Sequence, residues 1–239
     1  MDPRYKSPTV PVDGEDQDSF RSLHTLSTAL VWMLRAGAVV AALSLVSSIM
    51  QLELLRQPYT EAQGIENDQR EGAIGGFSLV LALATFVVFG IWIVRAHRNL
   101  PALGARHLEF TPGWALGWFF VPIAYFWKPY QAMRALWQNS RDATRPHTQD
   151  TTWVMPVWWG LWIISMVLGN YLIRHSFETA TVAQLTEVTQ VTMLDCFVDV
   201  FLYLVASLLV GRIWQFQLEQ RNNPSAYAPA PGFADGAGG

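Results

Sequence analysis

The stretch GAIGGFSLVLALATFVVFGIWIV, residues 72–94, decides the fold class of this chain because its 23 residues include no ionisable side chain. The hydrocarbon core of a bilayer is about 30 Å thick, and a helix that rises about 1.5 Å per residue needs about 20 apolar residues to cross it. The stretch is longer than that requirement. It therefore predicts a transmembrane helix.

Three further apolar stretches predict three more transmembrane helices. The first covers about residues 29–52 and carries Arg35 in its first turns, from which the long side chain can reach the lipid headgroups. The second covers residues 153–173, and the third covers about residues 191–214 and contains two aspartates. The sequence thus predicts an all-α integral membrane protein with about four transmembrane helices.

The composition agrees with a membrane protein and argues against several other classes. Hydrophobic residues make up 51% of the 239-residue chain and charged residues only 15%, with 11 tryptophans. The formal net charge of -3 gives no indication of a nucleic-acid partner. The single cysteine, Cys196, excludes an intrachain disulfide and a cysteine-rich metal site.

One apolar segment, residues 113–127, is short for a membrane crossing. As a helix its 15 residues would reach only about 22 Å. Pro122 lies in the middle of the segment, where it removes a backbone hydrogen bond and kinks a helix. A half-inserted segment that enters the membrane and returns therefore competes with a fifth span.

The distribution of lysine and arginine favours the half-inserted segment. With four spans, 13 of the 16 basic residues lie on one side of the membrane and 3 on the other, whereas five spans divide them into 8 and 8. Basic residues in short loops concentrate on the cytoplasmic side. We therefore expect four spans, a Pro-broken half-inserted segment at 113–127, and both termini in the cytoplasm.

A cytoplasmic amphipathic surface helix is predicted over residues 129–141, because apolar side chains recur there at helical spacing opposite polar ones. The apolar positions are Tyr130, Met133, Leu136 and Trp137. Two environments are open for this stripe, namely the lipid surface and the other helices of the protein.

The remaining segments flank or connect the predicted helical membrane domain at residues 29–216. Residues 1–28 form an acidic, proline-containing arm that we expect to be disordered, and residues 217–239 form a low-complexity Pro/Ala/Gly tail. Residues 53–71 are expected to be a solvated connection, and residues 174–190 could continue either flanking helix.

Several motifs in the middle of the chain resemble a known family. They are RAHRN at 95–99, FTPGWALGWFFVP at 110–122, WKPY at 127–130 and WWGLW at 158–162. Over roughly residues 74–216 the chain resembles the bacterial membrane-protein family catalogued as domain of unknown function 4328, which is common in actinomycetes. The resemblance implies a location in the bacterial plasma membrane and brings no known reaction, ligand or functional residue.

Asp195 and Asp199 are the first candidate functional residues, because two residues four positions apart share one face of a helix. A carboxylate near the bilayer centre costs about 2.5–3.5 kcal/mol on insertion scales, so it usually faces a cavity or a cation. Arg174, at the end of the preceding span, could pair with one of them. The aspartates are either a proton or cation site or a structural pair near the interface.

A basic cluster interleaved with tryptophans forms the second candidate site. It comprises Arg95, Arg98, Arg106, Lys128, Arg134, Arg141 and Arg145. Basic pockets on the cytoplasmic side can hold anionic lipid headgroups. The alternative is that these residues only fix the topology.

No motif indicates catalysis. The chain has no nucleophile elbow, no HExxH and no phosphate-binding glycine loop, and no carboxylate pattern joins His97 and His107 into a metal site. We therefore expect no enzyme activity and no cofactor. The sequence favours a noncatalytic membrane module that organises lipid or scaffolds a protein partner. The alternative is a small transporter or channel for protons or cations, which a polar cavity reaching both aspartates would favour.

Overall fold

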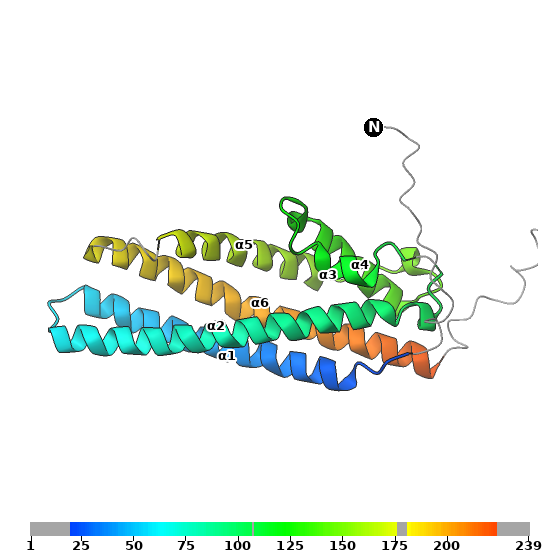
Figure 1. Ribbon diagram of the computed structural model, residues 1–239, viewed down its shortest axis with the longest axis horizontal. Helices are drawn as coiled ribbons and strands as arrows, with labels where there is room; N and C mark the ends of the chain where they lie inside the picture. Colours follow the sequence, from blue (N-terminus) through cyan, green and yellow to red (C-terminus); the bar gives the residue numbers. More distant parts are fainter. Residues whose placement is uncertain (1–19, 107, 176–180, 224–239) are drawn as a thin grey trace, which may run out of the picture. The chain divides into compact units, whose positions relative to one another are not determined.

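The computed structural model describes residues 20–106, 108–175 and 181–223, whose path is drawn in Figure 1. Every regular element within these ranges is a helix. Most of the predicted N-terminal arm, the tail from residue 224 and His107 lie outside the described residues.

Four long helices dominate the described chain. They are α1 (His24–Leu55), α2 (Glu61–Arg98), α5 (Val154–His175) and α6 (Val182–Asn222). The shorter elements are η1 (Pro101–Leu103), α3 (Pro112–Gly117), η2 (Ala124–Phe126), α4 (Lys128–Arg141) and η3 (Pro146–Thr148). The four long helices are long and apolar enough to cross a membrane. The prediction of an all-α membrane protein with four such helices is therefore confirmed.

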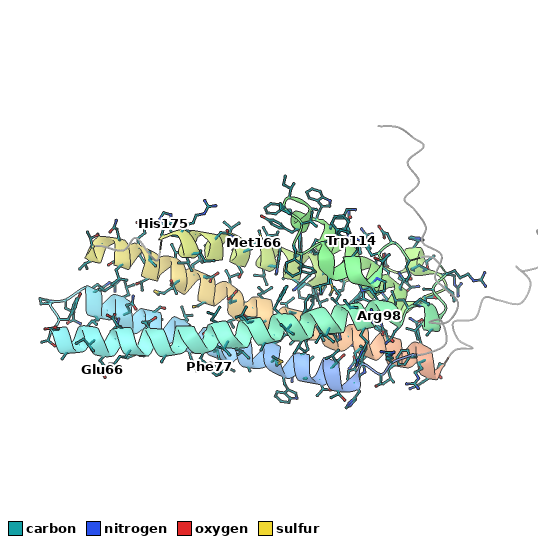
Figure 2. The ribbon with its side chains drawn as sticks, viewed as in Figure 1. Glu66, Phe77, Arg98, Trp114, Met166 and His175 are labelled. Carbon is teal, nitrogen blue, oxygen red and sulfur yellow. The ribbon has the colours of Figure 1, made fainter. Side chains whose placement is uncertain are left out.

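Large apolar side chains project from the long helices away from the protein. Phe77 of α2, labelled in Figure 2, is 60% exposed, and Val80 on the same helix is 66% exposed. Val39 of α1 is 60% exposed as well. Water would solvate these faces poorly, at a cost of about 25 cal/mol per Å². Lipid tails solvate them without that cost, so the exposed faces agree with a bilayer environment.

Three of the long helices extend beyond the apolar stretches that predicted them. α1 begins at His24, inside the predicted arm, and α6 continues to Asn222, past the predicted limit at residue 214. α2 begins at Glu61, so most of residues 53–71 is helical. The non-helical connection is therefore shorter than residues 53–71, because backbone hydrogen bonding continues into residues too polar for the hydrocarbon layer.

Two capping boxes explain where these extensions begin. The Thr60 amide donates to Gln63 Oε1 at 2.8 Å, and the Gln63 amide donates to Thr60 Oγ1 at 3.3 Å. Thr181 and Gln184 exchange the same pair of hydrogen bonds at 3.1 and 3.2 Å. Such reciprocal bonds satisfy amides that have no partner in the first turn of a helix. They therefore start α2 and α6 within polar sequence.

The chain divides into two compact units, which we describe separately. The helical unit comprises Leu26–Gly90 and Thr152–Gly211. The hairpin unit comprises Met1–Thr25, Ile91–Thr151 and Arg212–Gly239. α2 and α6 each contribute residues to both units.

In the hairpin unit, residues 113–127 form a broken return instead of one continuous helix. Thr111 Oγ1 caps α3 by accepting a hydrogen bond from the Trp114 amide at 3.4 Å, and the helix ends after 6 residues. Pro122 has no amide hydrogen, and the next residue, Ile123, turns the chain with a φ of 68°. α3 and η2 then both contact α4. The break therefore falls at the predicted proline.

The apolar stripe of α4 packs inside the hairpin unit. Met133, Leu136 and Trp137 are 2%, 0% and 6% exposed. The Trp137 ring meets the Phe216 ring of α6 edge to face at 5.0 Å. Of the two environments open for this stripe, the structure therefore shows protein rather than lipid.

Buried amide side chains join α2, α4 and α6 within the hairpin unit. Gln217 donates to the Ala96 carbonyl and to Ser140 Oγ, each at 3.1 Å, and it accepts a hydrogen bond from Asn99 at 3.2 Å. Gln220, one turn further along α6, donates to the backbone of α4 at 3.0 Å. Every polar atom of the Gln217 amide group is thus engaged by the protein.

Candidate functional site

A partly open cavity of about 220 Å³ lies in the helical unit, lined by residues of α1, α2 and α6. Small side chains leave the room for it, namely Gly37 and Ala41 of α1 with Gly75 and Ala82 of α2. On α2 the lining runs from Glu71 to Thr85, which is about 21 Å at a rise of about 1.5 Å per residue. The cavity is therefore elongated along the helix axes.

The charged groups of the lining are all acidic. Glu71 comes from α2, and Asp195 and Asp199 come from α6, where they lie about one turn apart. Among the described residues that line the cavity, none is a lysine, arginine or histidine. The lining therefore offers carboxyl groups to a ligand. Glu71 also has a cation nearby, because Arg70, which is not part of the lining, lies 3.6 Å from its carboxylate.

Three hydroxyl groups of the lining present acceptor oxygens to the cavity. Ser44, Thr85 and Thr192 each donate their single hydroxyl hydrogen to the carbonyl four residues earlier, at 3.0, 2.7 and 2.9 Å. Because that hydrogen is engaged within the helix, only lone pairs of these oxygens remain for a ligand. The lining thus favours ligands that are positive or that donate hydrogen bonds.

The two aspartates have different surroundings. Asp199 Oδ1 accepts a hydrogen bond from Ser165 Oγ of α5 at 2.7 Å, which fixes its orientation. Asp195 Oδ1 is buried and has no hydrogen-bond partner among the described residues, and Ser78 Oγ of α2 is in the same situation. Both atoms belong to residues that line the cavity. Two buried oxygens are therefore left for a ligand to satisfy.

Packing is tight at the end of the cavity opposite Glu71. A methyl group added to Gly37 of α1 would lie 3.3 Å from three atoms of the Tyr203 ring on α6. Contacts this short are tighter than ordinary van der Waals distance. Gly37 therefore allows the Tyr203 ring to approach α1 closely at this end.

The structure brings together some of the ion-pathway candidates and not others. Asp195 and Asp199 share the cavity, as their spacing indicated. Arg174 lies exposed near the end of α5, and within the described chain no ion pair joins it to either aspartate. It is also nine residues, or about 13 Å, along α5 from Ser165, which contacts Asp199.

Sequence reasoning missed Glu71, because it assigned residues 53–71 to a connection. A signal was present in the sequence: Glu71, Gly75, Ser78 and Thr85 are small or polar and recur at helical spacing within an otherwise apolar stretch. Such a stripe marks the face of a membrane helix that avoids lipid.

The seven predicted basic residues all belong to the hairpin unit, where several have partners within the protein. Lys128 Nζ lies 5.7 and 5.6 Å from the ring centres of Phe110 and Trp118. Arg141 donates to the Asp150 carbonyl at 2.9 Å, and Arg145 lies 3.7 Å from an Asp142 oxygen. The remaining four are half-buried or exposed, namely Arg95, Arg98, Arg106 and Arg134.

Among the described residues, no three or more histidine, cysteine, aspartate and glutamate side chains form a group that could hold a metal ion. His97 is buried at 2% exposure, and its Nδ1 donates to the Ile93 carbonyl at 2.9 Å. That contact gives it a packing role in the hairpin unit.

Comparison with known protein families identifies the family of this chain. The sequence model of the family described as Domain of unknown function (DUF4328) matches residues 58–215. This range includes the cavity lining on α2 and α6 and leaves out the lining on α1. No curated protein and no solved structure matches the chain. Since the family model covers more than half of the sequence, the resemblance is confirmed, and the chain belongs to the family of domain of unknown function 4328.

Proposed function

We propose that the protein binds protons or small cations in the cavity of the helical unit and passes them along it. The observation that carries this proposal is the chemistry of the lining. Three carboxyl groups and three hydroxyl oxygens that can only accept face a cavity whose described lining has no basic side chain. Hard cations prefer oxygen ligands of this kind, and the negative lining repels anions.

The cost of burying the aspartates supports the same function. An ionised carboxylate near the bilayer centre costs about 2.5–3.5 kcal/mol on insertion scales. Asp195 and Asp199 are close enough to repel each other, which adds to that cost. A bound cation or proton would offset both terms. A structural pair would be expected to satisfy its oxygens within the protein, whereas Asp195 Oδ1 has no partner among the described residues.

We place the protein in a bacterial plasma membrane with both termini on the cytoplasmic side. The uneven distribution of basic residues supports this orientation, because 13 of 16 lie on one side when four spans are assumed. In this orientation the end of the cavity at Glu71 faces outward.

The proposal can be tested with the purified full-length protein in liposomes. Proton entry is followed with a trapped pH dye, and cation entry with radioactive sodium and calcium. We expect at least one of these ions to enter faster than into protein-free liposomes. Asp199→Asn removes a carboxylate from the lining and should slow that entry about tenfold, which corresponds to about 1.4 kcal/mol of lost interaction.

Glu187→Gln is the matched control. Glu187 is an acidic residue of α6 outside the cavity lining, and it accepts a hydrogen bond from the Tyr171 hydroxyl at 2.6 Å. Its loss should leave ion entry unchanged. If no ion enters faster than into protein-free liposomes, or if Asp199→Asn behaves as the parent protein does, the proposed function is wrong.

A second candidate function is a noncatalytic module that contacts and organises lipid. The hairpin unit supports it, because Trp114, Phe120 and Ile123 are 54%, 65% and 70% exposed within one short segment. Trp114 is labelled in Figure 2. A segment that places large apolar side chains on the surface is expected to enter the membrane.

Spin labels on a Cys196→Ser background can test this second function. A label at Ile123→Cys should be relaxed by oxygen, which concentrates in lipid, and a label at the exposed Glu109→Cys should be relaxed by a water-soluble nickel complex. Equal access of the nickel complex to both labels would contradict membrane insertion of the hairpin.

A further inference from the structure

A belt of polar side chains crosses the helical unit beside the Glu71 end of the cavity. Asn67 of α2 donates to Gln51 of α1 at 3.4 Å, and Gln51 donates to Thr189 of α6 at 2.8 Å. On each helix the belt residue lies three or four positions from a lining residue, which on a helix is about one turn. The belt therefore joins all three lining helices just beyond the cavity.

Arg70 joins the belt at Asn67 and extends it to Ser47 of α1. Its Nε donates to Ser47 Oγ at 2.8 Å, and its Nη2 donates to the Ser47 carbonyl at 3.3 Å and to Asn67 Oδ1 at 2.6 Å. Three hydrogen bonds hold the planar guanidinium group in one orientation. The positive charge is thus fixed beside the cavity mouth rather than free to sample the solvent.

Glu71 connects the belt to the cavity. It lines the cavity, it accepts a hydrogen bond from Ser47 Oγ, and it lies 3.6 Å from Arg70 Nη2. This separation is longer than the 2.7–2.9 Å that is typical, as a rough guide, of a direct charge-assisted hydrogen bond. Both side chains are 29% exposed. The contact between Arg70 and Glu71 is therefore loose and partly hydrated, so another cation can compete for the carboxylate.

We infer that Arg70 is a tethered cation that competes with entering ions for Glu71 and so controls entry at this end of the cavity. Because Arg70 is held 3.6 Å from Glu71, its charge repels an approaching cation and partly neutralises the first carboxylate of the lining. When an entering cation binds Glu71 in place of Arg70, it can then move from this carboxylate to Asp195 and Asp199. This inference rests on the proposed function and assigns regulation to the same site.

The test measures uptake of sodium, calcium and protons by the full-length protein in liposomes, at ion concentrations well below saturation. Arg70→Gln removes the charge and keeps a side chain that can donate to Ser47 and Asn67. We expect uptake to rise about fivefold, because one unit charge at about 4 Å changes the interaction by about 1 kcal/mol in a water-like medium. Arg70→Lys keeps the charge and should behave as the parent protein does.

Arg56→Gln is the matched control at the same end of the helices. Arg56 pairs with Glu53 at 2.8 Å, but the two side chains are 60% and 59% exposed and do not line the cavity. This variant should leave uptake unchanged. A rise that is the same in Arg70→Lys as in Arg70→Gln would show that the belt acts through packing and would overturn the inference.

The failures of the two proposals can be told apart. If the parent protein takes up an ion in a manner that depends on Asp199, and Arg70→Gln does not change the rate, the inference on Arg70 is wrong and the proposed function stands. If neither the parent protein nor Arg70→Gln takes up any ion, the proposed function is wrong and the inference on Arg70 is wrong with it.

Discussion

The two units of the molecule can be compared by the partners and the surroundings of their buried polar side chains. In the hairpin unit, Gln217 is 0% exposed and its amide group is engaged by three partners. The hairpin unit also holds buried atoms without a partner among the described residues, but none of them lines the cavity; they are His97 Nε2, Trp137 Nε1 and Asn139 Oδ1. In the helical unit, Asp195 Oδ1 and Ser78 Oγ are buried without a partner among the described residues. Polar groups that satisfy one another hold a fold together. Polar groups left unsatisfied beside a cavity mark the place where a ligand would act.

The largest expected effect on stability comes from removing the hydrogen bonds of Gln217 in the hairpin unit. Gln217→Leu keeps the approximate volume of the side chain but leaves the Ala96 carbonyl, Ser140 and Asn99 each short of a partner. We expect the free energy of unfolding to fall by about 3 kcal/mol. Thermal unfolding in detergent, followed by circular dichroism, measures the change.

A control on the same helix sharpens that result. Leu218, the next residue along α6, is 38% exposed, so Leu218→Ala should cost less than about 1 kcal/mol. If Gln217→Leu is as stable as the parent protein, the hairpin unit does not depend on its polar network.

A smaller loss is expected from filling the tight contact at Gly37. In Gly37→Ala the new methyl group would meet the Tyr203 ring at 3.3 Å, so either the ring or α1 must shift. We expect a loss of about 1–2 kcal/mol in the free energy of unfolding. Gly160→Ala is the control, because a methyl group there meets nothing within 4 Å. Equal melting temperatures for the two variants would contradict the close packing at this end of the cavity.

The smallest effect on stability is expected at Asp195, where substitution should raise the free energy of unfolding instead of lowering it. Asp195→Asn removes a buried charge whose Oδ1 has no partner among the described residues. We expect the free energy of unfolding to rise by about 1 kcal/mol while ion uptake is lost, since functional groups are often held at the expense of stability. The same melting experiment, with uptake in liposomes beside it, measures both. A loss of stability as large as that of Gln217→Leu would show that Asp195 is structural.

The sequence predicted the parts of the fold that depend on local composition. Apolar stretches identified four helices, and Pro122 identified the break in the hairpin. Helix ends were predicted less well, because an apolar stretch marks only the hydrocarbon layer. The capping boxes at Thr60 and Thr181 lie outside it.

The candidate site was predicted only in part. Asp195 and Asp199 were identified because charges are rare within a membrane helix. Their cavity also needs Glu71 from α2 and small residues such as Gly37 from α1. Which faces of three helices meet is decided by packing between distant segments, which residue spacing along one helix does not reveal.

The central claim is that the carboxyl groups of the cavity bind cations or protons. Infrared difference spectroscopy of the full-length protein in lipid measures this directly, because the carboxylate stretching bands shift when a carboxylate takes up a metal ion or a proton. We predict bands on exchange of sodium, calcium or proton concentration that disappear in Asp195→Asn/Asp199→Asn and persist in Glu187→Gln. Identical difference spectra for the double variant and the parent protein would contradict the account.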